Sequence, residues 1–245
     1  MSAAWLKVLA KRVLHSCGLE LQRLKHVNSE RTVLRHILKS TQPAVVLDVG
    51  ANTGQYAALL RDVGFRGKIV SFEALPDVHA VLENASARDG AWIVAPCAAL
   101  GRKAGTLEIN RAGNSVSSSL LPMLATHVDA APDSAYVGTQ TVRVERLDVL
   151  AEQLVAGSGN LMLKIDTQGY EREVLEGATR LMPRITALQV EISLVSLYEG
   201  APTLTQIVSH LESCGYQIFS LVPGFRDART GRLLQMDGFF IRVPQ

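Results

Sequence analysis

The residues best suited to chemistry are two carboxylates, Asp166 and Glu191, which stand near the ends of the apolar runs LMLKID and ALQVEIS. Open α/β sheets bind ligands at the carboxyl ends of their strands. There the two groups could act as a base and its orienting partner, or hold a hard divalent cation. Neither has a third ligand nearby in sequence, so we predict no metal. Lys164 shares a strand face with Asp166 at a spacing of two, which leaves a structural ion pair as the alternative.

A second group of residues suits a nucleotide-like ligand. The segment VVLDVGANTG is an apolar run, an acid and then two glycines four positions apart. Glycine lets the backbone approach a ligand closely. The order is not the dinucleotide fingerprint G-x-G-x-x-G, and an acid before a small-residue turn favours a cationic ligand that carries an amino acid. We therefore expect S-adenosylmethionine as the cofactor. The expected contacts in this segment are Asp48, Gly50, Ala51, Asn52 and Gly54.

Two further strand ends complete the expected cofactor site. The run KIVSFE ends in Glu73, 25 positions after Asp48, where an acid can accept hydrogen bonds from both ribose hydroxyls. The run WIVAPCAAL brings Ala98 to the same edge of the sheet, and so small a residue leaves room for a flat adenine ring. A surface acid and simple core packing are the respective alternatives.

The stretch from Arg111 to Gln140 is rich in Ser, Ala, Asn and Pro and has no clear periodicity. We expect a long loop, and loops of that length are usually functional, often as lids. Its NSVSSS segment offers hydroxyls and an amide to a ligand or a sugar. His127 lies in the same loop and is a third candidate base, with a solvated histidine as the alternative.

Alternating strand and helix patterns must position these groups. We expect strands near residues 44–48, 68–73, 91–95, 161–166, 186–192, 216–221 and 238–243, and short ones near 105–109 and 141–146. We expect helices near 54–63, 76–88, 171–182 and 203–214. The connection before the last strand has no room for a crossover helix. The last two strands therefore form an antiparallel pair at one side of an otherwise parallel sheet, which makes this an α/β fold.

The first 42 residues differ in charge from the rest. They hold eight basic and two acidic residues, a formal charge of +6, whereas the remainder carries −4. We expect a basic helical extension over 1–42, with helices near 3–15 and 29–39, and one domain over 43–245. Two interpretations of the extension stay open. Its helices pack on the body or form a homodimer contact, or Trp5 and the basic residues dock weakly on an anionic membrane surface.

Composition narrows the class of protein. A net charge of +2 gives no case for a nucleic-acid partner. No apolar run approaches the roughly 18 residues of a membrane span, and charges interrupt the first apolar stretch, which disfavours a secretory signal. The three cysteines form no C-x-x-C pair and indicate reduced thiols. We expect a cytoplasmic protein, with peripheral contact at the inner membrane face left open.

Taken together, these runs resemble the FkbM family of S-adenosylmethionine-dependent methyltransferases. The resemblance covers roughly residues 44–243, and its combination of motifs is more specific than any one of them. The matching runs are LDVGANTGQY, SFEALP, NSVSSSL, VERLDVL, LKIDTQGYEREVLEGA and LQVEISL. The DTQGYE version and the continuation ISLVSLYEG are similar to members that O-methylate sugars, including rhamnose and fucose units of cell-envelope glycolipids.

The resemblance implies a Rossmann-like methyltransferase fold with seven strands, mostly parallel, and a reversed last strand. It also implies cofactor contacts at Asp48, Gly50, Asn52, Gly54 and Glu73. The commoner family form of the fourth motif is K-I-D-V-E-G-x-E. In this chain Thr and Gln replace the Val and the first Glu, so any role of that acid is absent.

The implied activity is O-methylation of a sugar hydroxyl on a glycolipid or related glycoconjugate. A sulfonium methyl is already activated, so the protein must align the acceptor oxygen and take up its proton. Asp166 is the first candidate base, followed by Glu191 and His127. One alternative is an NAD(P)-dependent oxidoreductase, but the chain lacks both G-x-G-x-x-G and Tyr-x-x-x-Lys. The other is a non-catalytic cofactor-binding protein, which the intact set of cofactor residues disfavours.

Overall fold

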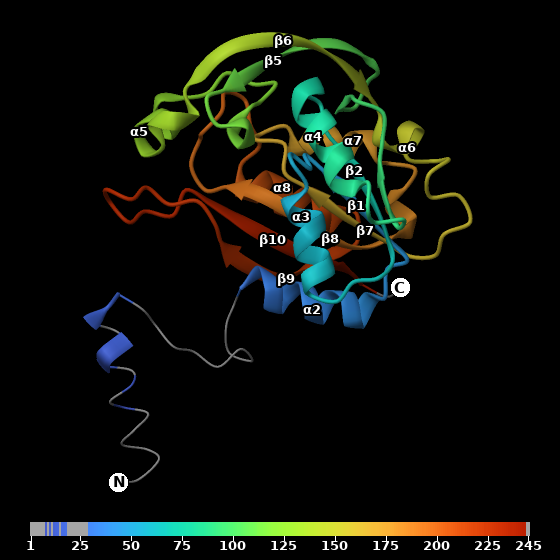
Figure 1. Ribbon diagram of the computed structural model, residues 1–245, viewed down its shortest axis with the longest axis horizontal. Helices are drawn as coiled ribbons and strands as arrows, with labels where there is room; N and C mark the ends of the chain where they lie inside the picture. The colour runs from blue at the N-terminus through green and yellow to red at the C-terminus, as the bar shows by residue number, and fades with distance from the viewer. Residues whose placement is uncertain (1–7, 9, 11, 15, 19–28, 244–245) are drawn as a thin grey trace.

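The computed structural model describes residues 8, 10, 12–14, 16–18 and 29–243 (Figure 1). The helix expected near 3–15, including Trp5, lies largely outside the described residues. The core of the fold is a seven-stranded sheet in the order β3-β2-β1-β7-β8-β10-β9. Within the described part of the chain, no helix has the length and apolar character needed to cross a bilayer.

The sheet confirms the predicted α/β architecture. Five strands, β3, β2, β1, β7 and β8, pair in parallel, and β10 runs antiparallel to both β8 and β9. Every residue of β1 and β7 is buried, as expected for central strands covered on both faces. The strands are β1 (Val45–Val49), β2 (Lys68–Phe72), β3 (Trp92–Val94), β7 (Leu161–Ile165), β8 (Ile185–Ser193), β9 (Tyr216–Pro223) and β10 (Gln235–Arg242).

Helices cover both faces of this sheet. The helices are α2 (Glu30–Thr41), α3 (Gln55–Asp62), α4 (Pro76–Ser86), α6 (Leu147–Leu150), α7 (Glu171–Gly177) and α8 (Leu204–Ser213). Side chains alternate between the faces of a strand, so Val46 packs with α2 and α3 while Leu47 packs with α7 and α8. Leu34 and Ile37 of α2 are fully buried in the core that contains Val46. The second predicted helix of the basic extension is therefore bound to the sheet.

A second, three-stranded sheet has the order β4-β6-β5. It consists of β4 (Ala99–Leu100), β5 (Gly105–Ala112) and β6 (Tyr136–Glu145). Figure 1 shows β5 and β6 as an arch on the side of the molecule opposite α2. Val78 of α4 packs with Ile109 and Val142 beneath this arch.

The expectation of an unstructured loop from Arg111 to Gln140 is wrong in part. The ends of the stretch belong to β5 and β6, and between them lie η2 (Ser115–Ser117), α5 (Ala125–Ala130) and η3 (Pro132–Ser134). Each of these helical pieces is too short to show an amphipathic period. In the same way, α7 ends at Gly177, before the predicted residue 182.

Candidate functional site

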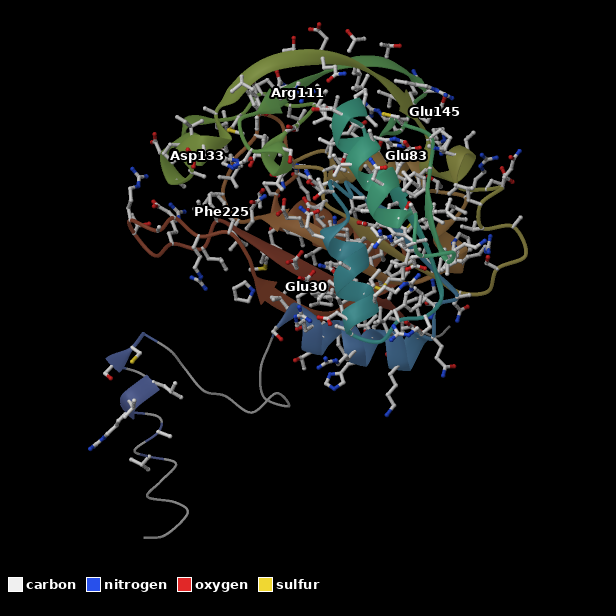
Figure 2. The ribbon with its side chains drawn as sticks, viewed as in Figure 1. Glu30, Glu83, Arg111, Asp133, Glu145 and Phe225 are labelled. Atoms are coloured by element: carbon white, nitrogen blue, oxygen red, sulfur yellow. The ribbon has the colours of Figure 1, made fainter. Side chains whose placement is uncertain are left out.

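A cavity of about 440 Å³ opens at the carboxyl ends of β1, β2 and β7. Its walls come from these strand ends, from β8 and β10, from the η2 segment and from the first residue of α2. Figure 2 shows Arg111 and Glu145 on the β5–β6 arch and Glu30 at the start of α2, on the opposite side of the molecule. The site is therefore where an open α/β sheet is expected to bind a ligand.

The turn after β1 is pressed against the end of β7. Gly50 has a φ of +74°, and a Cβ at this position would stand 1.8 Å from the backbone oxygen of Asp166. The N–H groups of Gly50 and Ala51 both donate to the Phe72 carbonyl oxygen, at 3.1 and 3.0 Å. Only glycine fits this close approach of backbone to backbone. The first predicted glycine thus shapes the cavity floor, and Ala51 and Asn52 line it.

Glu73 lies at the cavity wall with its carboxylate held in one orientation. Its Oε1 accepts from the N–H groups of Ala74 and Leu75 at 2.8 and 2.9 Å, and its Oε2 accepts from Asn52 N at 2.9 Å. Burial raises the pKa of Glu73, and the three backbone donors oppose that rise. Ala98 lines the same cavity. Glu73 and Ala98, which were predicted to contact the ribose and the adenine, therefore line one cavity.

Asp48 and Gly54 lie behind the cavity wall instead of lining it. A Cβ on Gly54 would meet the Trp92 ring at 2.5 Å. Asp48 is fully buried, where its Oδ2 accepts from Ser71 Oγ at 3.3 Å and its Oδ1 lies 3.3 Å from Lys164 Nζ. Desolvation raises the pKa of Asp48, and the lysine opposes the rise. In this position Asp48 can hold Lys164 but does not face a ligand.

Lys164 connects the buried acid to the cavity. Its Nζ lies 3.6 Å from Asp166 Oδ2 and donates to the Gly50 carbonyl oxygen at 3.1 Å. Desolvation lowers the pKa of Lys164, but Asp48 and Asp166 outweigh it and raise that pKa overall. The ion pair considered from the sequence therefore exists. The Asp166 side chain is nevertheless 36% exposed and lines the cavity.

Asp166 and Glu191 lie close together, as their positions at adjacent strand ends predicted. The residue that bridges them was not singled out as functional in the sequence. The Gln168 amide donates to Asp166 Oδ1 at 2.9 Å and to Glu191 Oε2 at 2.7 Å. Desolvation and the neighbouring carboxylates of Asp166, Glu171 and Asp237 raise the pKa of Glu191 well above its usual value. In the sequence, Gln168 stood out only because it replaces the first Glu of the common family motif.

A second group of this kind lines the cavity on the side of α2. The Gln189 amide donates to Glu30 Oε1 at 2.7 Å and to Asp237 Oδ1 at 3.1 Å, and the Tyr56 hydroxyl donates to Gln189 Oε1 at 2.7 Å. Desolvation raises the pKa of Asp237 to about 7. None of these four residues was predicted. The signal available was Asp237 in the apolar strand QMDGFF, whereas Glu30 looked like any exposed helix residue.

The structure places His127 away from the cavity. The residue is 3% exposed, and its ring centroid lies 5.2 Å from that of Tyr198 and 5.3 Å from that of Phe225. Desolvation lowers the pKa of His127. Among the three candidate bases, it is the one that the fold does not bring to the site. By contrast, Ser115 of the NSVSSS segment lines the cavity and accepts from Asn52 Nδ2 at 3.1 Å.

No group of three or more His, Cys, Asp or Glu side chains in the described ranges is arranged to hold a metal ion. The paired carboxylates at the site are bridged by amide donors instead. The prediction that no metal is bound stays a prediction.

The turn from β7 into α7 is fixed by one buried acid. Glu171 Oε1 accepts from the N–H groups of Thr167 and Gly169 at 3.1 and 3.0 Å, and from Thr167 Oγ1 at 3.3 Å. Burial raises the pKa of Glu171 to about 7, although these backbone donors oppose the rise. The turn that carries Asp166 and Gln168 is thus built around a carboxylate that titrates near neutrality.

Glu171→Gln is expected to flatten the pH dependence of stability. A raised folded-state pKa favours folding below the unfolded value of about 4.3, and this contribution is lost as the pH rises through about 7. The variant should therefore lose on the order of 2 kcal/mol less free energy of unfolding than the wild type between pH 4.5 and 8. Urea unfolding at several pH values measures this. Glu176→Gln on the same helix is the control, and equal pH dependence in wild type and Glu171→Gln would refute the prediction.

Comparison with known proteins relates this chain to methyltransferases. Residues 48–218 match the family model described as the methyltransferase FkbM domain. Hexuronic acid methyltransferase AglP of Haloferax volcanii is 26% identical over 174 residues, which is 71% of this chain and 66% of AglP. The matched part thus spans just under two thirds of that relative.

Solved structures with similar folds include two methyltransferases. The mitomycin 7-O-methyltransferase MmcR is 12% identical with a TM-score of 0.43, over 87% of this chain and 54% of MmcR. The precorrin-6y C5,15-methyltransferase of Geobacter metallireducens is 13% identical with a TM-score of 0.47, over 91% of this chain and 94% of that one.

Proposed function

Because the chain belongs to the FkbM methyltransferase family, we propose that it is an S-adenosylmethionine-dependent O-methyltransferase that acts on a sugar hydroxyl of a glycolipid or related glycoconjugate. One observation carries the proposal. Asp166, at the end of β7, lines the same cavity as the Gly50 turn and Glu73. A candidate base and the residues suited to the cofactor therefore face one space.

The lining of the cavity fits S-adenosylmethionine. One part is apolar, with Leu75 and Ala98 beside Glu73, and suits an adenosine whose ribose hydroxyls donate to that carboxylate. The turn at Gly50 and Asn52 is positioned for the amino-acid end. When bound, the cofactor supplies an electrophilic methyl group. Five acidic side chains line the cavity, and those that are ionised favour a ligand with a positive sulfonium; the five are Glu30, Glu73, Asp166, Glu191 and Asp237.

Two neighbouring carboxylates with different surroundings divide the acid–base roles. Lys164 Nζ lies 3.6 Å from Asp166 Oδ2, whereas desolvation and nearby acids raise the pKa of Glu191. Such a difference is typical of catalytic carboxylate pairs. With the cofactor bound, Asp166 would take the proton of the acceptor hydroxyl as that oxygen bonds to the methyl carbon and the sulfonium S–C bond breaks, which leaves the cofactor as a neutral thioether. Glu191 stays beside it, connected through the Gln168 amide.

Glu73→Gln is expected to weaken S-adenosylmethionine binding by about 10- to 100-fold, since a hydrogen bond to a charged group contributes roughly 1.5–3 kcal/mol. The glutamine amide would also set its own N–H group against a backbone N–H group that now donates to the Glu73 carboxylate. Isothermal calorimetry measures the dissociation constant. Glu83→Gln, on the exposed side of α4, is the matched control. Equal affinity in wild type and Glu73→Gln would remove Glu73 from the cofactor site.

A sugar acceptor is supported by the name of the relative, a hexuronic acid methyltransferase. The narrower parts of the proposal rest on the sequence alone. These are a glycolipid as the sugar carrier, peripheral contact with the inner membrane face, a cytoplasmic location and a homodimer.

The proposal is tested by deleting the gene and comparing glycolipid masses, with the loss of one methyl group as the expected change. Purified protein and isotope-labelled S-adenosylmethionine should then restore the methyl group to glycolipid extracted from the deleted strain. Unchanged glycolipids together with no transfer to the extract would overturn the glycolipid acceptor. Calorimetric binding of NAD(P), and not of S-adenosylmethionine, would favour the oxidoreductase alternative.

A further inference from the structure

Gln168 occupies a conformation that a non-glycine residue rarely adopts. Its φ is +54°, in the left-handed region, and the residue is only 8% exposed although it lines the cavity. Such a backbone conformation costs free energy and persists only where the surroundings hold it in place. Contacts around Gln168 must therefore hold this strained backbone between the two candidate acids.

The side chain of Gln168 is the bridge between those acids. Its single Nε2 donates to Asp166 Oδ1 at 2.9 Å and to Glu191 Oε2 at 2.7 Å. An amide nitrogen carries two hydrogens, so both are used. Without this donor, two carboxylates from adjacent strands would face each other across the cavity floor. Like charges in that arrangement resist ionising together.

Contacts on the other side fix the amide so that its nitrogen faces the acids. The Tyr198 hydroxyl donates to Gln168 Oε1 at 2.6 Å and lies 3.3 Å from the Ser117 carbonyl oxygen. Ser119 Oγ donates to the Gln168 carbonyl oxygen at 2.7 Å. The same residue thus contacts both acids and the NSVSSS segment above them. Its orientation is set by groups from three separate parts of the chain.

The arrangement occurs a second time in the same cavity. There the Tyr56 hydroxyl donates to Gln189, whose amide bridges Glu30 and Asp237. Each set consists of a tyrosine, a glutamine and two carboxylic acids. The recurrence supports a definite role for the glutamine, which is to keep two acids close while supplying a neutral donor between them.

We propose that Gln168 is a positioning residue, which aims Asp166 at the acceptor hydroxyl and holds Glu191 beside it through the second hydrogen of the same amide. This inference rests on the proposed methyl transfer and extends it to a residue that does not itself touch the reacting atoms. The charged and titratable groups that face the pair come from five other places in the fold. They are Lys164 on β7, Asp48 on β1, Glu171 on α7, Asp237 on β10 and Tyr198 after β8.

Two variants separate the geometric and the electrostatic parts of this role. Gln168→Met keeps the length of the side chain and removes both donors, and it should lower kcat by about 10- to 100-fold with little change in KM for the glycolipid extract. Gln168→Glu puts a third carboxylate between the first two. It should move the acid limb of the pH–rate profile up by about one pH unit or more.

The matched control is Gln235→Met. Gln235 donates to the same Glu191 oxygen at 2.8 Å but does not bridge to Asp166, so its loss should shift the acid limb much less. Gln206→Glu, in the exposed capping box of α8, controls for the added charge. Tyr198→Phe releases the far end of the Gln168 amide and should reproduce part of the Gln168→Met defect, which keeps the test usable if one variant does not fold.

Infrared titration of the carboxyl groups supplies a readout that needs no acceptor. Gln168→Glu should show one more protonated carboxyl near neutral pH than the wild type, and Gln206→Glu should not. If the wild type transfers no methyl group but this difference appears, the proposed function fails and the charge coupling by Gln168 stands. A fall in kcat with an unmoved pH profile and an unchanged infrared titration would overturn the inference, because it would reveal a purely structural role.

Discussion

Asp166→Asn is expected to lower the rate of methyl transfer by about 100- to 10,000-fold, the usual contribution of a well-placed base. The substitution is isosteric, and its amide oxygen can still accept from Gln168. Lys164 keeps its contacts with Asp48 and the Gly50 carbonyl oxygen. The cavity should therefore keep its shape and its affinity for S-adenosylmethionine while it loses the group that takes the proton.

Two measurements check this result. Transfer to glycolipid extract gives the rate, and calorimetry gives the affinity for the cofactor. Asp62→Asn, at an exposed ion pair with Arg31, is the control and should match the wild type in both. If Glu191→Gln abolished turnover while Asp166→Asn retained it, the two carboxylates would have to exchange roles.

The main sheet could be predicted because each of its strands is a short apolar run bounded by turn residues. The run before Asp48 and the run before Asp166 read as buried strands, and both are fully buried in the fold. The reversed β10 followed from the short connection that precedes it. The length of β5 and β6 was underestimated, since half of their residues are exposed and the burial along them shows no clean alternation.

The encounter of Asp166 with Glu191 was predictable from their strand-end positions alone. The row from Ser71 through Asp48 to Lys164 was not, because it depends on the register of three neighbouring strands, which a single sequence does not encode locally. Such a row explains why an apolar run ends in Lys-x-Asp. The lysine lies between a buried acid on the next strand and an acid in the cavity.

The group around Gln189 shows the limit of sequence reasoning most clearly. Its members, Glu30, Tyr56, Gln189 and Asp237, come from two helices and two strands and are spread over most of the chain. No spacing rule connects them. They meet because α2 packs on the sheet beside β8 and β10. The predicted extension is consequently part of the cavity wall, through its residue Glu30.

Gly50→Ala is expected to lower the free energy of unfolding by more than about 3 kcal/mol and to abolish measurable S-adenosylmethionine binding. The new Cβ would stand 1.8 Å from the backbone oxygen of Asp166, so one of two main chains must move. Neither is free, because Asp166 N donates to the Val49 carbonyl oxygen at 3.1 Å and Gly50 N donates to Phe72. Strain at a φ of +74° adds roughly 1–2 kcal/mol to the clash.

Gly64→Ala separates these two causes. Gly64 has a φ of +100°, yet a Cβ there would meet no atom within 4 Å. This control should therefore show the backbone strain alone, roughly 1–2 kcal/mol, with cofactor affinity unchanged. Urea unfolding and calorimetry on both variants give the comparison. Equal losses of stability would mean that the close approach of the Gly50 turn to Asp166 contributes nothing beyond strain, and the turn could then not be the element that fixes the cofactor next to the base.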